Sequence, residues 1–231
     1  MAKKVFIGVG HGGTDPGAAA NGLKEKNLNL AIALACQDEL ARHGVLVKMS
    51  RKKDENDPLT DEIKECNEFN PDLAAGIHNN AGGGDGAEVY HSIYGGTGKT
   101  LAENILAQIM KLGQNSRGIK TKKNSQGKDY FGFIRQTKAP AVIVECAFVD
   151  NKKDIKIIDT KKEQQAMGVA IAKGILKTLE IPYRAKEEKL YRVLDGEDQQ
   201  VGAYSEVANA LDKAKELLKS EDSVKITYGQ K

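Results

Sequence analysis

The stretch KVFIGVGHGGTDPG at Lys4–Gly17 is the part of the sequence on which the fold prediction rests. Its first half, Lys4–Val9, is an apolar run with β-branched residues, which is typical of a buried strand. Its second half is rich in glycine, so the backbone can turn sharply and leave His11 uncrowded directly after the strand. Functional groups gather beyond the carboxyl ends of strands in open parallel sheets, which makes His11 the first candidate for a functional residue.

The rest of residues 1–183 alternates between predicted strands and predicted helices. Further strands are expected at Val45–Ser50, Leu73–His78, Glu88–Ile93 and Ala141–Ala147, and helices at Asn27–His43, Leu59–Phe69, Leu101–Leu112 and Glu163–Leu179. Strands that alternate with helices indicate an α/β fold, in which a mainly parallel sheet is covered by helices on both faces.

The C-terminal part of the chain has a different organisation. Pro182 ends the alternating unit, and the charged stretch RAKEEK at 184–189 predicts a linker between a domain of residues 1–183 and a small α+β element of residues 190–231. That element is expected to contain a strand at Leu190–Leu194, an acidic turn at Asp195–Asp198, a helix at Glu206–Lys219 and a strand at Val224–Thr227.

The predicted C-terminal helix carries its apolar residues on one stripe. The stripe consists of Val207, Ala210, Leu211, Ala214, Leu217 and Leu218. An element of this size is small for an independent domain, so we expect the stripe to dock on the larger domain or to form a homodimer.

Composition and cysteine usage exclude several classes of protein. The formal net charge is only +3, whereas a nucleic-acid partner would require a clustered basic face, so we expect none. Cys36, Cys66 and Cys146 are widely spaced and form no CxxC motif, which predicts three reduced thiols. The chain begins without the apolar stretch of a signal peptide and contains no run of about 18 apolar residues, so we expect cytoplasmic synthesis and no membrane span.

Three side chains could converge on one metal ion at the ends of the predicted strands. His11 and His78 each stand at the carboxyl end of a strand, and Glu25, in the loop before the first helix, can supply an oxygen ligand. Two imidazoles, one carboxylate and one open position are a common form of catalytic zinc site. The sequence therefore predicts a zinc site at this edge of the sheet.

Glu145 is the candidate for proton transfer beside that metal. It ends the apolar run Ala141–Val144, and a carboxylate in such a run is costly unless it has a function. Near a water molecule on the metal it could take up a proton and pass it to a leaving amine. Cys146 should point to the opposite face of the strand, so we expect it to pack in the core rather than act as a nucleophile.

Each of these residues also has a structural explanation. His11 alone could be a polar loop residue, and His78 could cap a turn together with the asparagines that follow it. Glu25 could be a solvated charge at a helix entry, and Glu145 could form an ion pair with a buried Lys or Arg. Their common position at one edge of the sheet favours the functional interpretation.

A nucleotide-binding protein is a different alternative. The segment GGTGKT at Gly95–Thr100 resembles a phosphate-binding loop that follows a strand and precedes a helix. The full pattern requires a glycine five positions before Gly98, where Ile93 stands, so the match is incomplete. Loss of function on Lys99→Ala, with His11→Ala tolerated, would favour this alternative.

Five motifs together are more specific than any of these residues alone. They are HGGTDPG at His11–Gly17, Glu25 before NLNLA, IHNNA at Ile77–Ala81, GAEVYH at Gly86–His91 and AVIVECAFVDNKKD at Ala141–Asp154. Their order and spacing span nearly all of residues 4–180, and in these motifs the chain resembles the amidase-3 family of zinc-dependent N-acetylmuramoyl-L-alanine amidases.

The resemblance implies an activity and a set of site residues. His11, Glu25 and His78 would bind Zn²⁺, and Glu145 would be the catalytic carboxylate. The reaction would be hydrolysis of the peptidoglycan amide bond between N-acetylmuramic acid and L-alanine, with Glu145 moving a proton from the attacking water to the leaving amine. Another zinc hydrolase on the same scaffold, such as a peptidase or a deacetylase, remains an alternative that the products would distinguish.

Two further residues are candidates for substrate contact. The segment Phe133–Arg135 resembles a family motif that makes Arg135 one candidate, although a surface or ion-pair arginine is an equal alternative. Asn80 in the IHNNA motif is the other candidate.

The C-terminal element weakly resembles one half of a sporulation-related (SPOR) repeat, mainly through VGAYSEVANALDKAKELL at 201–218. Such repeats bind glycan strands, so the element is expected either to bind the cell wall or to mediate self-association. The resemblance as a whole implies a phage endolysin or a sporulation or autolytic amidase, which would act on the wall after release by lysis or a holin-like route.

Overall fold

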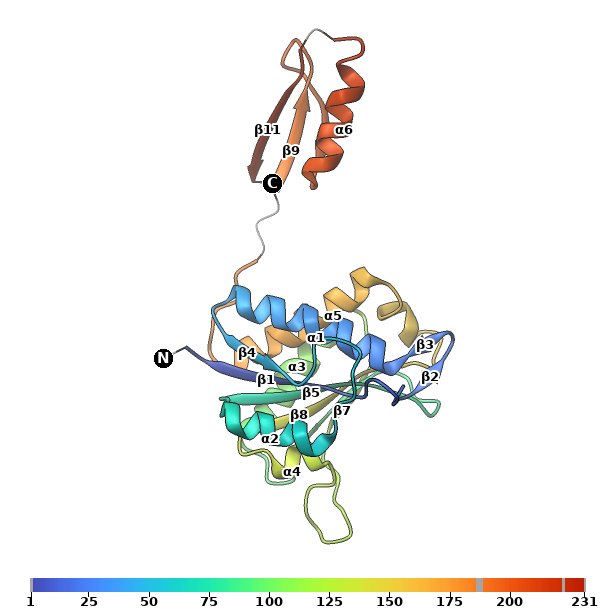
Figure 1. The fold of residues 1–231 in the computed structure, drawn as a ribbon, viewed down its shortest axis with the longest axis vertical. Helices are drawn as coiled ribbons and strands as arrows, with labels where there is room; N and C mark the ends of the chain where they lie inside the picture. The colour runs from blue at the N-terminus through green and yellow to red at the C-terminus, as the bar shows by residue number, and fades with distance from the viewer. Residues whose placement is uncertain (1, 186–188, 222, 231) are drawn as a thin grey trace. The chain divides into compact units, whose positions relative to one another are not determined.

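The computed structural model describes residues 2–185, 189–221 and 223–230. The chain divides into two compact units, Met1–Tyr183 and Arg184–Lys231, which are treated separately below (Figure 1). The predicted linker at 184–189 lies partly outside the described residues.

A six-stranded sheet forms the centre of the first unit. Its strands are β1 (Lys4–Val9), β4 (Leu46–Met49), β5 (Leu73–Asn80), β6 (Ala87–His91), β7 (Ser116–Lys120) and β8 (Ala141–Phe148), in the order β4-β1-β5-β8-β6-β7. All neighbouring strands are parallel except β6 and β8, which are antiparallel. The prediction of a mainly parallel sheet is therefore confirmed.

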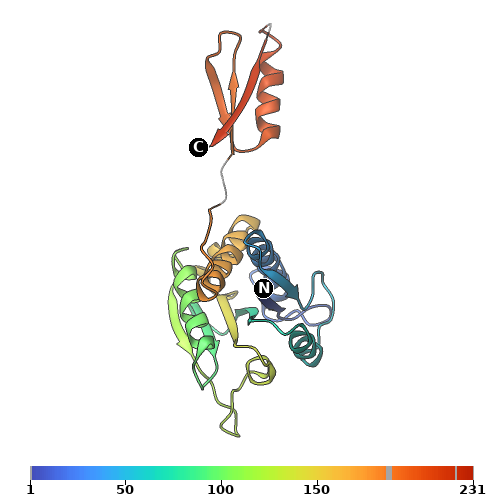
Figure 2. The same cartoon turned by 90° about the vertical axis from the view of Figure 1, so that its left-hand side faces the viewer.

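Helices cover both faces of this sheet, as predicted (Figures 1 and 2). One face carries α1 (Glu25–Arg42), α3 (Thr97–Met110) and α5 (Lys161–Thr178), and the other carries α2 (Leu59–Phe69) and the short α4 (Gly132–Gln136). A small hairpin of β2 (Ala19–Ala20) and β3 (Leu23–Lys24) precedes α1, and a 3₁₀ turn, η1 (Asp154–Ile157), follows β8.

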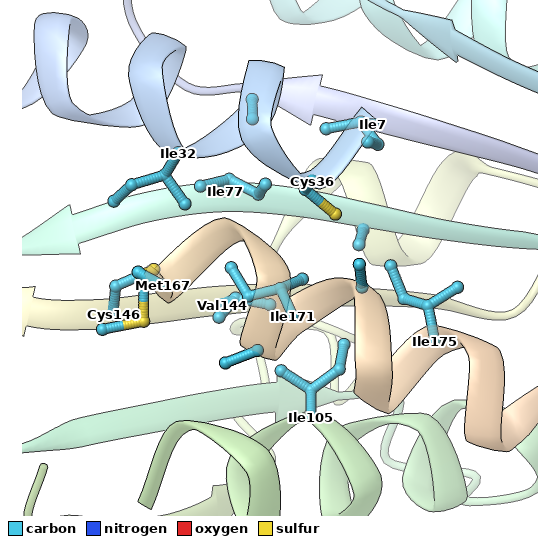
Figure 3. Packing of buried hydrophobic residues seen from close by; sticks show 14 of the residues in the cluster. Ile7, Ile32, Cys36, Ile77, Ile105, Val144, Cys146, Met167, Ile171 and Ile175 are labelled. Atoms are coloured by element: carbon cyan, nitrogen blue, oxygen red, sulfur yellow. The ribbon is translucent and has the colours of Figure 1, made fainter. Parts of the chain in front are cut away.

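The larger hydrophobic core lies between the sheet and the layer of α1, α3 and α5. Ile32 of α1, Ile105 of α3 and Ile171 of α5 are fully buried there and face residues of the central strands (Figure 3). A Cβ atom on Gly168 of α5 would lie 2.4 Å from the backbone oxygen of Ile32, so this glycine lets α1 and α5 pack closely. Cys146 also packs in this core, which confirms its predicted orientation.

Three of the predicted site positions differ in their local structure from the sequence prediction. Glu25 is the first residue of α1 rather than a loop residue. His78 and Glu145 lie inside their strands, because the pairing of β5 with β8 continues past the His78–Glu145 pair to Asn80 and Phe148. The sequence prediction also contained no element for β7 or α4.

The second unit is a three-stranded antiparallel sheet with one helix. Its elements are β9 (Lys189–Leu194), β10 (Gln200–Tyr204), α6 (Val207–Leu217) and β11 (Lys225–Gln230), and the strand order is β10-β9-β11. The prediction missed β10, which carries only short apolar stretches around Gly202 but completes the sheet by pairing with β9.

The predicted apolar stripe of α6 is divided between two surfaces. Ala210 and Ala214 pack with Val193 in the small core of this unit. Val207, Leu211 and Leu218 remain 46%, 45% and 53% exposed. Among the residues that the structure describes, neither unit contains a helix long and apolar enough to cross a bilayer.

Candidate metal centre

The loop after β1 brings His11 over the carboxyl ends of β1 and β5. His11 itself has a φ of 62°, in the left-handed region that residues other than glycine rarely adopt. Gly17 closes the loop with a φ of 63°, and a Cβ there would lie 2.6 Å from both the Glu25 carboxylate and the His11 ring. The glycines that drew attention in the sequence therefore make room for the ligands as well as for the turn.

His11, Glu25 and His78 form a cluster whose candidate ligand atoms all lie within 4.8 Å of one another. His11 Nε2 lies 3.2 Å from Glu25 Oε2, and His78 Nδ1 lies 3.1 Å from Glu25 Oε1. The two rings are 5.3 Å apart and nearly perpendicular. Two imidazole nitrogens and one carboxylate from three separate elements match the donor set of catalytic zinc sites, so these residues fit the predicted ion.

Hydrogen bonds from outside the cluster fix the orientation of its members. The carboxylate of Asp15 lies 2.8 Å from His11 Nδ1, which leaves Nε2 directed at Glu25. Glu25 accepts hydrogen bonds from the backbone amides of Ala18 and Asn79 and from the side chain of Asn29. Such partners hold metal ligands in place and set the tautomer of a ligating histidine.

The cluster favours the charged form of its imidazoles. The hydrogen bond to Glu25 raises the pKa of His11 to about 9. Burial lowers the pKa of His78, but the contact with Glu25 outweighs this and the net shift is upward. Burial likewise opposes ionisation of Glu25, yet the two histidines lower its pKa. A divalent cation that displaced the imidazole protons would satisfy the same carboxylate.

Glu145 lies directly beside this cluster. It pairs with His78 across β5 and β8, so the two side chains project from the same face of the sheet. In the described part of the chain the carboxyl of Glu145 has no hydrogen bond or ion pair within 4 Å, and burial raises its pKa to about 7. The alternative of a structural ion pair with a buried Lys or Arg is therefore not what the structure contains.

Two basic residues of β7 pair with a different carboxylate. Glu88 of β6 lies beside Glu145 in the sheet and pairs with Arg117 and Lys120. It also accepts hydrogen bonds from the Tyr90 hydroxyl and from Asn80 Nδ2. Asn80, which was predicted to contact substrate, is thus held in a network with Glu88.

Arg135 is not brought to the metal cluster. Its guanidinium donates to the backbone carbonyls of Asp129 and Tyr130, at distances of 2.7 and 2.8 Å. The side chain is exposed and fixes the loop that precedes α4. These hydrogen bonds give Arg135 a structural role, and its contact with substrate stays a prediction.

A cavity of about 590 Å³ opens over the cluster on the face of the sheet that carries α2 and α4. It is lined by Val9, Gly10, His11, Gly12, Asp15, Asn56, Asp57, Pro58, Leu59, Glu62, His78, Phe131, Gly132, Phe133 and Ile143. Among these residues, only the two histidines were predicted from the sequence as site residues.

Arg51 is another residue near the site that was not predicted from the sequence. It follows β4, is only 2% exposed, and donates to the backbone carbonyls of Val9, Gly10 and Lys26. These bonds anchor the loop that carries His11. An arginine placed directly after a predicted strand was the available signal, and it has the same form as the signal that identified His11.

The segment Gly95–Thr100 forms a turn and the beginning of α3. Lys99 is exposed and lies 3.9 Å from Glu103 on the same helix. The segment contributes no residue to the cavity over the metal cluster. Its glycines serve the helix start, where Gly95 and Gly96 both have positive φ.

Comparison with known proteins gives one consistent result. Residues 5–177 match the model of the Amidase_3 family, described as N-acetylmuramoyl-L-alanine amidase. The N-acetylmuramoyl-L-alanine amidase CwlM of Bacillus licheniformis is 35% identical over 213 residues, which are 90% of this chain and 78% of the relative. The sporulation-specific N-acetylmuramoyl-L-alanine amidase of Bacillus subtilis (strain 168) is 33% identical over 211 residues, with coverage of 90% and 77%.

A phage protein and a solved structure are also similar. The endolysin of Bacillus phage SPP1 is 35% identical over 190 residues, covering 78% of this chain and 68% of the endolysin. Cwp6 from Clostridium difficile superposes with a TM-score of 0.76 and 39% identity, covering 78% of this chain and 30% of that one. The two Bacillus matches cover 90% of the chain, more than the first unit alone can supply, so they extend into the second unit.

Proposed function

The chain belongs to the N-acetylmuramoyl-L-alanine amidase family Amidase_3, and from this membership we propose how its residues carry out the reaction. The enzyme hydrolyses the cell-wall amide bond between N-acetylmuramic acid and L-alanine. We propose that His11, Glu25 and His78 hold a zinc ion and that Glu145 carries the proton. The observation that supports this most directly is the three-ligand cluster beside an unpaired carboxyl.

Zinc held by these three residues would supply a Lewis acid that polarises a carbonyl and lowers the pKa of water. Asp15 would keep Nε2 of His11 directed at the centre through its bond to Nδ1. Glu145 would accept a proton from the attacking water at a carboxylate oxygen. It would then deliver that proton to the nitrogen of L-alanine as the amide C–N bond breaks.

The environment of Glu145 suits both halves of this proton transfer. A carboxyl with a pKa of about 7 both loses and regains a proton readily near neutral pH. The two acidic neighbours, Glu25 and Glu88, contribute to the raised pKa after burial, which is the largest cause. Because Glu88 is already paired with Arg117 and Lys120, those cations do not neutralise Glu145.

The test is product analysis of purified peptidoglycan by mass spectrometry. The wild type should release stem peptides with a new L-alanine amino terminus, and a chelator should abolish release until zinc is restored. Glu145→Gln should bind zinc with unchanged stoichiometry and release almost nothing, whereas Glu103→Gln, on the exposed surface of α3, should match the wild type. Full release by the wild type in excess chelator would rule out the metal mechanism.

The second unit is proposed to bind the wall or to mediate self-association. Tyr191 pairs with Tyr204 on one side and Tyr228 on the other; Tyr191 and Tyr204 pack against the small core of this unit, whereas Tyr228 is 75% exposed. An exposed aromatic ring suits contact with sugar rings, whereas the exposed Val207 and Leu211 of α6 suit a homodimer.

Two measurements distinguish these roles of the second unit. Cosedimentation of the full chain with insoluble peptidoglycan should weaken in Tyr228→Ala if the unit binds the wall. Light scattering of the wild type and of Leu211→Ser should reveal a dimer that the substitution dissociates if the unit mediates association. Because an endolysin is among the relatives, we also propose that the chain acts on the wall after release from the cell.

A further inference from the structure

Glu62 carries a second carboxyl without a partner among the described residues, and it lines the cavity over the histidines. It projects from α2 over the sheet, where a Cβ on Gly8 of β1 would lie 2.0 Å from its Oε1. Within the described residues the carboxyl of Glu62 has no hydrogen bond and no ion pair within 4 Å, although α2 holds it against β1 and Phe133 lies beside the same glycine. Burial, followed by the nearby Asp57, raises the pKa of Glu62 to about 7.

The cavity around Glu62 is acidic, although the chain as a whole is mildly basic. Asp15, Asp57 and Glu62 line it, and none of its described lining residues is a lysine or an arginine, in a chain with 35 of them. Asp15 is already engaged with His11, and Asp57 accepts a hydrogen bond from Ser50, which leaves Glu62 as the lining carboxyl without a partner among the described residues. The electrostatic character of the cavity therefore favours a cationic group of the substrate over an anionic one.

The backbone sets the separation between Glu62 and the metal cluster. The His78 ring occupies the space over Gly10, because a Cβ there would lie 2.1 Å from His78 Cε1. Gly8 lies in β1 and Gly10 directly follows its end, so the two glycines are two residues apart, which corresponds to about 6.6 Å along an extended backbone. An extended peptide whose amide bond lies at the histidines would cover that distance in about two residues.

Stem peptides of peptidoglycan carry a suitable cation within reach of Glu62. Their first residue is L-alanine, their second is an acidic residue, and their third is a diamino acid whose side-chain amine is free unless cross-linked. We propose that Glu62 binds this free ammonium group, so that the enzyme prefers stem peptides that are not cross-linked through the diamino acid. The proposal rests on the proposed function, because the scissile amide must lie at the metal cluster.

The test uses two synthetic substrates that differ only in this amine. One is the N-acetylmuramoyl tripeptide L-Ala–D-Glu–L-Lys with a free lysine amine, and the other is the same molecule acetylated on that amine. Steady-state kinetics are measured for the wild type, Glu62→Gln and the control Asp61→Asn, which changes an exposed neighbour on α2 outside the cavity. Thermal unfolding of each variant checks the fold.

The wild type should cut the free-amine substrate with a kcat/KM at least about 10-fold above that of the acetylated substrate, the size of one charge-assisted hydrogen bond. Glu62→Gln should lose this preference through KM, with kcat nearly unchanged, and should cut the acetylated substrate as the wild type does. Asp61→Asn should retain the preference.

Several results would overturn the proposal. Equal kcat/KM of the wild type on both substrates would mean that the amine is not recognised, and this comparison needs no variant. An equal loss of kcat by Glu62→Gln on both substrates would instead make Glu62 part of the proton transfer. Failure of the wild type on both substrates and on intact peptidoglycan would contradict the amidase mechanism itself, and the proposal with it.

Discussion

The two faces of the six-stranded sheet use the same strands for different purposes. On the face that carries α1, α3 and α5, β1 presents Val5, Ile7 and Val9, all essentially fully buried. On the opposite face the same strand presents Phe6 and Gly8, and Gly10 directly follows its end. Because side chains alternate along a strand, one segment can supply packed side chains to the core on one face and, through its glycines, leave space for the cavity on the other.

The contrast sharpens toward the carboxyl ends of the strands. In β5, Ile77 packs in the main core while its neighbour His78 belongs to the cluster of candidate metal ligands. In β8, Val144 and Cys146 pack in that core while Glu145, between them, lies beside His78. Stability and chemistry are therefore interleaved residue by residue, and a shift of one position in register would exchange them.

The largest expected effect of breaking this division is on turnover. Glu145→Gln removes the proton carrier but keeps the shape of the side chain, so kcat should fall by about 10²–10⁴-fold. The melting temperature should not decrease, because the substitution replaces a carboxyl that burial keeps partly protonated. Initial rates on peptidoglycan and scanning calorimetry measure the two quantities. A fully active variant would show that the proton carrier lies elsewhere.

The adjacent face should give the reverse result. Ile77→Ala removes a fully buried side chain from the main core, at a cost of about 2–5 kcal/mol in the free energy of unfolding (Figure 3). For a chain of this size the melting temperature should fall by about 5–15 °C. At a temperature where the variant is folded, its kcat should stay within about twofold of the wild type. A large loss of kcat in a folded variant would mean that the two faces are coupled.

The sequence predicted the fold and the metal cluster for the same physical reason. Apolar runs mark buried strands, and a histidine or glutamate that interrupts or ends such a run is conspicuous, as His78 and Glu145 are. The direction of Glu25 could not be derived in this way, because a glutamate at a helix start has the same local pattern whether it is solvated or buried. Its place in the cluster was inferred from its position before the first helix, and the family resemblance implied the same role.

Glu62 and Arg51 were missed because their surroundings are made by long-range contacts. Glu62 lies in a helix in which charged residues are abundant, and only the packing of α2 against β1 buries it. Arg51 is buried by carbonyls from two other segments, Val9–Gly10 and Lys26. For Arg135 the motif did not predict the direction of the side chain, which donates to the carbonyls of Asp129 and Tyr130, and its contact with substrate stays a prediction.

The free energy of unfolding of the metal-free enzyme should depend on pH through Glu62, on the face of the sheet that bears the cavity. The pKa of Glu62 is about 7 in the folded protein and near the ordinary value of 4.5 when unfolded. Between these values the folded form holds a proton that the unfolded form has lost, so the free energy of unfolding falls as pH rises. The slope from this group is at most about 1.4 kcal/mol per pH unit.

Glu62→Gln should remove that contribution, because an amide does not titrate. The variant should gain stability relative to the wild type as pH rises from about 5 to about 7.5, reaching a difference of about 1–3 kcal/mol. Urea unfolding in the presence of a chelator, at several pH values, measures this difference. Parallel stability curves for the two proteins would mean that the Glu62 carboxyl is better solvated than its position over Gly8 indicates.

The smallest expected effect is on zinc affinity, and it comes from a single methyl group added on the face of the sheet that bears the cavity. In Gly10→Ala the new Cβ would overlap the His78 ring, whose Cε1 would lie 2.1 Å away, so the ring must move from its place beside Glu25. Loss of ligand positioning of this kind typically costs 10–100-fold in metal affinity. Gly98→Ala is the matched control, because its Cβ would meet nothing closer than 3.5 Å. Zinc titration against a competing chelator should show weaker binding only in Gly10→Ala. If both variants bound zinc like the wild type, His78 would not need the space over Gly10. The glycines on this face would then serve only to form the substrate cavity.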